Sequence, residues 1–127
     1  MSYYFAKTLD LPLEQAIERT VAALKQHGFG VLTRIDVETT LKEKIGATFR
    51  PYVILGACNP HMAFQALQAE DKIGTMLPCN VVVQEVAGRS EVAAVDPVAS
   101  MQAIDNPALA AIAGKVRADL KAVVESL

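Results

Sequence analysis

The sequence predicts an α+β domain, and three observations carry that prediction. Short runs rich in β-branched and aromatic residues alternate with segments whose apolar residues recur every three or four positions. Two strand-like runs, 79–86 and 91–95, are separated by the turn-like sequence 87–90, which indicates an antiparallel hairpin. The chain of 127 residues has no internal repeat or linker, so we expect one domain over residues 1–127.

The first third of the chain predicts a strand, a helix and a second strand. Residues 3–9 form the first strand, which ends at Asp10-Leu11-Pro12. An amphipathic helix follows up to Gly28, with apolar residues at spacings of four, four and three: Leu13, Ile17, Val21 and Leu24. Residues 29–35 then predict the second strand.

A short helix is expected next, capped by Asp36 and ending at Gly46, with Leu41 and Ile45 facing inward. Residues 49–58 predict the third strand. Its unbroken apolar run 53–58 indicates a central position with both faces buried.

Two further helices have the same kind of start. Asn59-Pro60 predicts a helix to about Glu70, because asparagine caps free amides and proline at the first helical position loses no hydrogen bond. The residues that this helix is expected to bury are Ala63, Phe64 and Leu67. The second such start, Asn106-Pro107, predicts a long final helix to residue 127 that packs across the sheet.

Composition narrows the classes of partner. Hydrophobic residues make up 52% of the chain and charged residues 20%, against an ordinary hydrophobic share of about 45–50%. This excess predicts self-association as a homo-oligomer. The net charge of −2 with scattered basic residues argues against nucleic acid. No apolar run reaches the roughly 18 residues of a membrane span, and the first residues do not resemble a signal peptide, so we expect a cytoplasmic protein without a membrane partner.

The two cysteines are the strongest candidates for reactive or ligand-binding side chains. Cys58 stands where the third strand passes into a helix, in Gly56-Ala57-Cys58-Asn59-Pro60. Free backbone amides and the positive end of the helix dipole would stabilise a thiolate there. A free cysteine is also commonly a small core residue, so a packing role is the alternative.

Cys79 begins the fourth predicted strand, and its relation to Cys58 depends on the topology. A helical connection between two strands is typical of parallel pairing, which would put the cysteines at opposite edges of the sheet. Antiparallel pairing would place both at one edge, within the roughly 7 Å between Cα atoms that a disulfide permits. The connection by itself favours the parallel arrangement.

Cys58, His61 and Cys79 are the candidate ligands for zinc, since His61 follows three residues after Cys58. A closed site needs four ligands, and no other Cys or His is spaced to complete it, so we expect no metal. Phosphate loops, nucleophile elbows and zinc-protease motifs are absent from the sequence. The sequence therefore leaves open whether the chain is an enzyme, and it indicates no cofactor.

Charged residues on or beside the strands could line a polar ligand cleft. They are Arg34, Arg50, Glu85, Arg89 and Glu91. A solvated sheet face accounts for the same residues, because an antiparallel sheet commonly leaves one face in water.

Several segments carry a resemblance to a known family. They are Ile54-Leu55-Gly56-Ala57-Cys58-Asn59-Pro60, then Ala63, Ala66-Leu67 and Ile73-Gly74, then Leu77-Pro78-Cys79-Asn80-Val81-Val82-Val83, and Asp96-Pro97. Together they closely resemble the domain of unknown function 302 (DUF302) family, over essentially the whole chain. The resemblance implies a TATA-binding-protein-like fold, strand–helix–four strands–helix, in which helices back a curved antiparallel sheet of about five strands, with extra short helices and a tendency to dimerise. It implies Cys58 and Cys79 at one edge and no particular activity, and His61 is not part of the matched motif.

Three hypotheses about function follow. The first is thiol chemistry (redox, sulfur transfer or soft-metal handling) with Cys58 as thiolate and Cys79 as its partner, and with Asn59 and Asn80 orienting the site. The second is non-catalytic binding of a small, partly apolar molecule on the sheet or between two subunits. The third is a dimeric interaction module in which the cysteines only pack.

Overall fold

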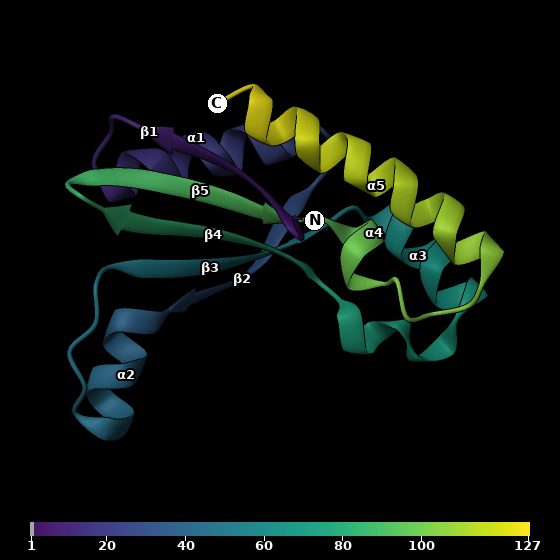
Figure 1. The fold of residues 1–127 in the computed structure, drawn as a ribbon, viewed down its shortest axis with the longest axis horizontal. Helices are drawn as coiled ribbons and strands as arrows, with labels where there is room; N and C mark the ends of the chain where they lie inside the picture. Colours follow the sequence, from purple (N-terminus) through teal and green to yellow (C-terminus); the bar gives the residue numbers. More distant parts are fainter. Residues whose placement is uncertain (1) are drawn as a thin grey trace.

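A computed structural model describes residues 2–127, and these form an α+β structure with a five-stranded antiparallel sheet. The strand order is β1-β5-β4-β3-β2, with β1 and β2 at the edges. Every neighbouring pair runs antiparallel. Helices cover one face of the sheet and continue beyond its end, where a second group of helices gathers (Figure 1). The predicted fold class and the antiparallel sheet are thus confirmed.

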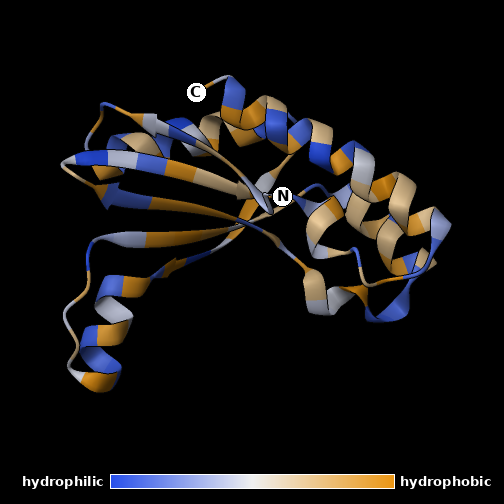
Figure 2. Cartoon of the chain, in the orientation of Figure 1, coloured by the Kyte–Doolittle hydropathy of each residue, from blue (hydrophilic) through white to orange (hydrophobic). Residues whose placement is uncertain are grey.

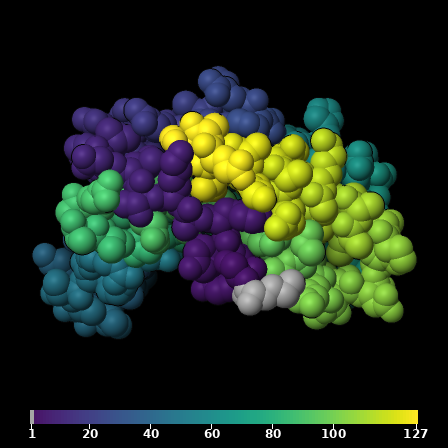
Figure 3. Space-filling model, turned by 45° about the horizontal axis from the view of Figure 1, so that its top comes forward, coloured from purple at the N-terminus to yellow at the C-terminus, as the bar shows by residue number. Residues whose placement is uncertain are grey.

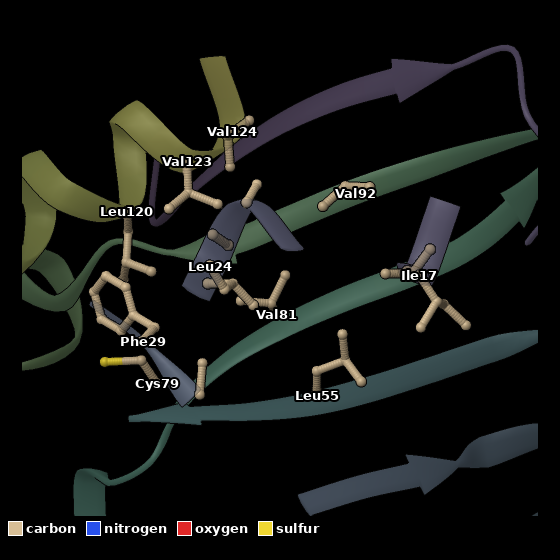
Figure 4. Close-up of a cluster of buried hydrophobic side chains, with 14 of the residues drawn as sticks. Ile17, Leu24, Phe29, Leu55, Cys79, Val81, Val92, Leu120, Val123 and Val124 are labelled. Atoms are coloured by element: carbon tan, nitrogen blue, oxygen red, sulfur yellow. The ribbon is translucent and has the colours of Figure 1, made fainter. Parts of the chain in front are cut away.

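The main core lies between the sheet and two helices, α1 (Leu13–Gln26) and α5 (Pro107–Glu125). Helix α5 crosses the visible face directly beside β1 (Figure 3). Valines of the central strands point at leucines of both helices (Figure 4). The side chains most completely enclosed include Leu24, Leu55, Val81, Val92 and Leu120. Burying each such side chain contributes roughly 1.5–3 kcal/mol, so this layer dominates the stability.

The amino-terminal elements follow the predicted order. Strand β1 (Tyr4–Leu9) alternates exposed and half-buried positions, as expected for an edge strand with one covered face. Helix α1 begins after Pro12, which is itself the cap residue, so Asp10 makes no cap hydrogen bond. Strand β2 (Gly30–Asp36) contains a bulge between Val31 and Thr33, a common feature of an edge strand.

Helix α2 (Val37–Ile45) corrects one prediction. The Asp36 side chain caps it as expected, accepting a hydrogen bond from the backbone N–H of Thr39 at 3.0 Å. Leu41 and Ile45 do not face a core, because α2 extends away from the edge of the sheet; Leu41 is half-buried and Ile45 is 73% exposed. Its hydrophobic segments are visible on a helix that lies apart from the main body (Figure 2).

Strand β3 (Tyr52–Cys58) starts after Pro51 rather than at residue 49, and it lies between β2 and β4. Its helix-facing residues are buried, but Ile54 on the opposite face is only half-buried. The unbroken apolar run therefore reflects one covered face and one open face, and the prediction of two buried faces was wrong.

The parallel pairing that the helical connection favoured was also wrong, since β3 and β4 (Cys79–Val86) run antiparallel. The intervening helix α3 (Pro60–Ala69) and 3₁₀ helix η1 (Asp71–Met76) do not cross the sheet. They fold out and back at the same end, so β4 starts where β3 finishes (Figure 1). The resemblance implied this arrangement.

Helix α3 turns a different face inward from the one expected. Met62 and Ala66 are buried and Ala63 is half-buried, whereas Phe64 is 63% and Leu67 45% exposed. The small Ala66 lets α3 pack closely on a second core cluster around Ile73, and this excludes the larger apolar side chains.

The last third of the chain contains the hairpin and two helices. The turn between β4 and β5 (Arg89–Val95) is tighter than predicted, because Ala87 and Gly88 both adopt positive φ angles. A short helix α4 (Pro97–Ser100), capped by Asp96, was not expected from the residue pattern. Asn106 caps α5 through the backbone N–H groups of Ala108 and Leu109.

Gly56 sits at the tightest contact in the sheet. It pairs with Thr33 of β2 and with Asn80 of β4. A Cβ atom added there would overlap the Thr33 Oγ1 and lie 2.7 Å from the Pro78 Cγ. Glycine is thus required by the space between β2 and the segment that enters β4.

We expect Gly56→Ala to destabilise the fold by about 1–3 kcal/mol, because overpacking must displace Thr33, Pro78 or the strand. Urea unfolding measures the loss of unfolding free energy, provided that the denaturant dependence (the m-value) is unchanged. Gly114→Ala is the matched control: its added Cβ meets nothing within 4 Å inside α5, and it should stabilise by about 0.5–1 kcal/mol. A partial rescue of Gly56→Ala by Thr33→Ala would identify the contact, and an unchanged stability of Gly56→Ala would contradict this account.

Candidate functional site

An apolar cavity of ≈ 40 Å³ lies at the end of the sheet, where β3 finishes and β4 begins. Its walls come from both core clusters and from helices α3, α4 and α5. Both cysteines, Cys58 and Cys79, line it, together with Asn59. One water occupies about 10–15 Å³ of such space, so the cavity admits a guest of only a few atoms.

Two capped helix starts hold the cavity wall in place. The Asn59 side chain accepts a hydrogen bond from the backbone N–H of Met62 at 3.2 Å, which fixes the first turn of α3. The Asp96 side chain accepts from the backbone N–H of Val98 at 3.0 Å and so fixes α4. Asp96 also accepts from Arg117 Nε of α5 at 3.1 Å. Because Asp96 is largely buried, this ion pair ties α4 to α5 on the far wall of the cavity.

The two thiols differ in environment. Cys79 is buried at the edge of the main core, near Phe29 and Leu120 (Figure 4). Burial raises the pKa of the Cys79 thiol to about 11, and the negative charge that Cys58 carries as a thiolate adds to the rise. Cys79 is therefore a neutral thiol at pH 7. Cys58 is half-buried, so reagents in solution have better access to it.

The strand register does not pair the cysteines with each other. Cys79 lies opposite Ala57, and Cys58 lies opposite Gly30 of β2. The two cysteines are therefore neighbours at the end of the sheet but not a directly opposed cross-strand pair. Both cysteines are free thiols.

The remaining predicted site residues lie outside the cavity. His61 is exposed on α3 and does not line the cavity. Among residues 2–127, no three His, Cys, Asp or Glu side chains are grouped closely enough to hold a metal. Asn80 is exposed and lines a groove on the open face of the sheet instead. The structure thus joins Cys58, Asn59 and Cys79 but separates Asn80 and His61 from them.

Two methionines complete the cavity and were missed from the sequence. Met62 and Met101 are both buried and line the same space as the cysteines. Met62 lies in the first turn of α3, four residues after Cys58, but Cys58 belongs to β3, so no helical spacing links the two. Met101 comes just after α4, far along the chain, and no local pattern links it to Cys58.

Of the charged residues considered for a polar cleft, Glu91 lines a groove on the open face of the sheet, and Arg50 contacts it through Gln84. This groove, of ≈ 390 Å³, is lined by Tyr4, Tyr52, Gln84 and Glu91 among others. Gln84 accepts a hydrogen bond from Arg50 Nε at 2.8 Å and donates one to Glu91 at 3.1 Å. These side chains are therefore engaged with one another across the strands.

Arg34, Glu85 and Arg89 do not line this groove. Arg34 instead pairs with Glu14 of α1 at 2.7 Å, and this hydrogen bond raises the pKa of Arg34. The predicted charged set is thus divided between separate parts of the surface.

The combination of an antiparallel sheet, two backing helices and paired Cys-Asn sequences defines a small α+β domain class, and sequence comparison identifies its family. The family described as "Domain of unknown function DUF302" matches residues 5–127, and the chain belongs to it. A crystal structure of an uncharacterized conserved DUF302 protein from Bacillus stearothermophilus is 32% identical, with a TM-score of 0.91 over 98% of each chain. No curated protein matches the chain. Within residues 2–127, no helix has the length and apolarity needed to cross a membrane.

The buried Cys79 thiol predicts a specific dependence of stability on pH. Its pKa is about 11 in the folded chain and near the ordinary 9.0 when unfolded, so the unfolded state alone ionises between these values. The free energy of unfolding should therefore fall as the pH rises from about 9 to about 11. Urea unfolding of the wild type and of Cys79→Ala at each pH measures how much of the pH dependence of the unfolding free energy comes from Cys79. Parallel curves for the two proteins would show that Cys79 is not responsible.

Proposed function

We propose that this chain is a thiol-based binding domain that holds a small, soft guest in the cavity beside Cys58. The observation that carries the proposal is that both cysteines line one apolar cavity at the end of the sheet. Cys58 is the accessible thiol and makes the contact with the guest. Cys79 stays protonated and forms part of the inner wall.

Binding accounts for the geometry better than dithiol redox chemistry does. The register places neither cysteine directly opposite the other, and both thiols are free. A neutral, buried thiol is also a poor attacking group, because the thiolate is the nucleophile in disulfide exchange. The cavity, in contrast, is present with both thiols free.

Alkylation with iodoacetamide tests which thiol is reactive in the folded protein. We expect the folded protein to lose one thiol, at Cys58, with release of iodide, whereas Cys79 reacts only after unfolding. Mass spectrometry of peptides after timed quenching locates the label. Cys79→Ala should react at the wild-type rate, and Cys58→Ser should be protected while folded.

Two results would argue against thiol-based binding. One is equal protection of both cysteines in the folded protein, because the accessible thiol would then not exist. The other is preferential labelling of Cys79, which would reverse the assigned roles. Circular dichroism of each variant establishes that it is folded before the comparison is made.

We also propose that the chain forms a homodimer through α2 and the adjoining edge of the sheet. Val37, Leu41 and Ile45 recur every four residues on α2, and every residue of this helix is exposed or half-buried. Ile35, near the end of β2 and two residues before α2, is 47% exposed. A nine-residue helix is marginal by itself, so packing against a second copy would stabilise it. Two-fold dimers with a shared patch are the commonest oligomers.

Ile45→Glu should raise the dissociation constant of the dimer by about tenfold or more, since it buries a charge in the contact. Sedimentation equilibrium over a range of protein concentrations measures this. Val98→Glu is the matched control, because Val98 is exposed on α4, away from α2. A wild-type chain that stays monomeric at high concentration, or equal effects of the two substitutions, would contradict the proposed interface.

A further inference from the structure

The cavity at the end of the sheet concentrates the sulfur atoms of the chain. The sequence has two cysteines and four methionines, and four of these six residues line the one small space. These four residues belong to different elements: Cys58 ends β3, Cys79 begins β4, Met62 lies in the first turn of α3 and Met101 follows α4. Local sequence therefore does not explain their convergence.

The other lining residues are almost entirely apolar, and they include Phe29, Leu109, Ile112 and Val116. Asn59 is the polar exception, and its side-chain oxygen is already engaged in capping α3. Oxygen and nitrogen ligands are therefore scarce at the cavity, and sulfur is the donor that it offers. Thiolate and thioether ligands select soft metals such as Cu(I) over harder divalent ions.

Charge balance favours a monovalent guest. An uncompensated charge in an apolar site is very costly, so a bound cation must be matched by the ligands. One thiolate and two neutral thioethers carry a total charge of −1, which a monovalent cation cancels. A divalent cation with the same ligands would leave a net positive charge in the cavity.

We propose that the cavity is a site for a monovalent soft metal cation of the Cu(I) type, held by the sulfur atoms of Cys58, Met62 and Met101. Cys79 also lines this cavity. Binding releases the Cys58 proton to solvent and involves no change of oxidation state. This inference rests on the proposed thiol-based binding function and names the class of guest.

Silver(I) is the redox-inert probe, and Cu(I) in a competing chromophoric chelator gives the affinity. We expect one equivalent to bind, and Cys58→Ser to weaken binding by at least about 100-fold, since it removes the only anionic ligand. Met62→Leu and Met101→Leu should each weaken it by about tenfold while preserving the apolar volume. Cys79→Ala should have a smaller effect than Cys58→Ser.

Met76→Leu is the matched control, because Met76 is 43% exposed at the end of η1 and does not line the cavity. Its affinity for Ag(I) should equal that of the wild type. Unfolding curves of the methionine variants establish that the fold is retained.

Three results would overturn the metal assignment. They are wild-type affinity in both Met62→Leu and Met101→Leu, retention of Ag(I) by Cys58→Ser, and binding of Zn(II) as tight as that of Cu(I). Selective alkylation of Cys58 without any Ag(I) binding would refute the metal site but leave thiol-based binding standing. If Cys58 is not selectively alkylated and Ag(I) does not bind, both the metal site and thiol-based binding are refuted.

Discussion

The antiparallel pairing of β3 with β4 is the constraint on which the cavity depends. The register places Gly56 opposite Asn80 and Ala57 opposite Cys79, so the last residue of β3 and the first of β4 meet at one end of the sheet. Only a glycine fits at position 56, because Thr33 and Pro78 occupy the space of a side chain. If this pairing shifted by one residue, Cys79 would turn from the core to the open face.

The same pairing explains why the helices form two separate clusters. Between β3 and β4 the chain makes a helical excursion, α3 followed by η1, that returns to the end of the sheet where it started. This excursion packs on α5 and builds the second apolar cluster around Ile73 and Leu109. The cavity lies where the two clusters join, lined by residues of both.

Residue patterns predicted where the helices and strands lie better than they predicted which side chains are buried and how the strands pair. The strands and long helices follow from periodicity and from caps such as Asn59 and Asn106, which act on the nearest backbone. Leu41 and Phe64 were expected to be buried because they are apolar, but burial depends on whether another element covers them. The pairing direction of β3 and β4 could not be read from the helical connection, because either direction permits a helix between strands. The resemblance supplied that direction.

The residues of the candidate site also fall into those that local sequence predicted and those that it did not. Cys58, Asn59 and Cys79 were identified because strand ends and helix caps have local signatures, and these residues do converge on the cavity. Met62 and Met101 were missed because a methionine has no signature of its own and resembles any apolar core residue. Met101 reaches the cavity through α4, which is tied to α5 by the partly buried ion pair of Asp96 with Arg117. A site assembled from such distant segments depends on tertiary packing, and its sulfur-rich lining becomes recognisable only when that packing is known.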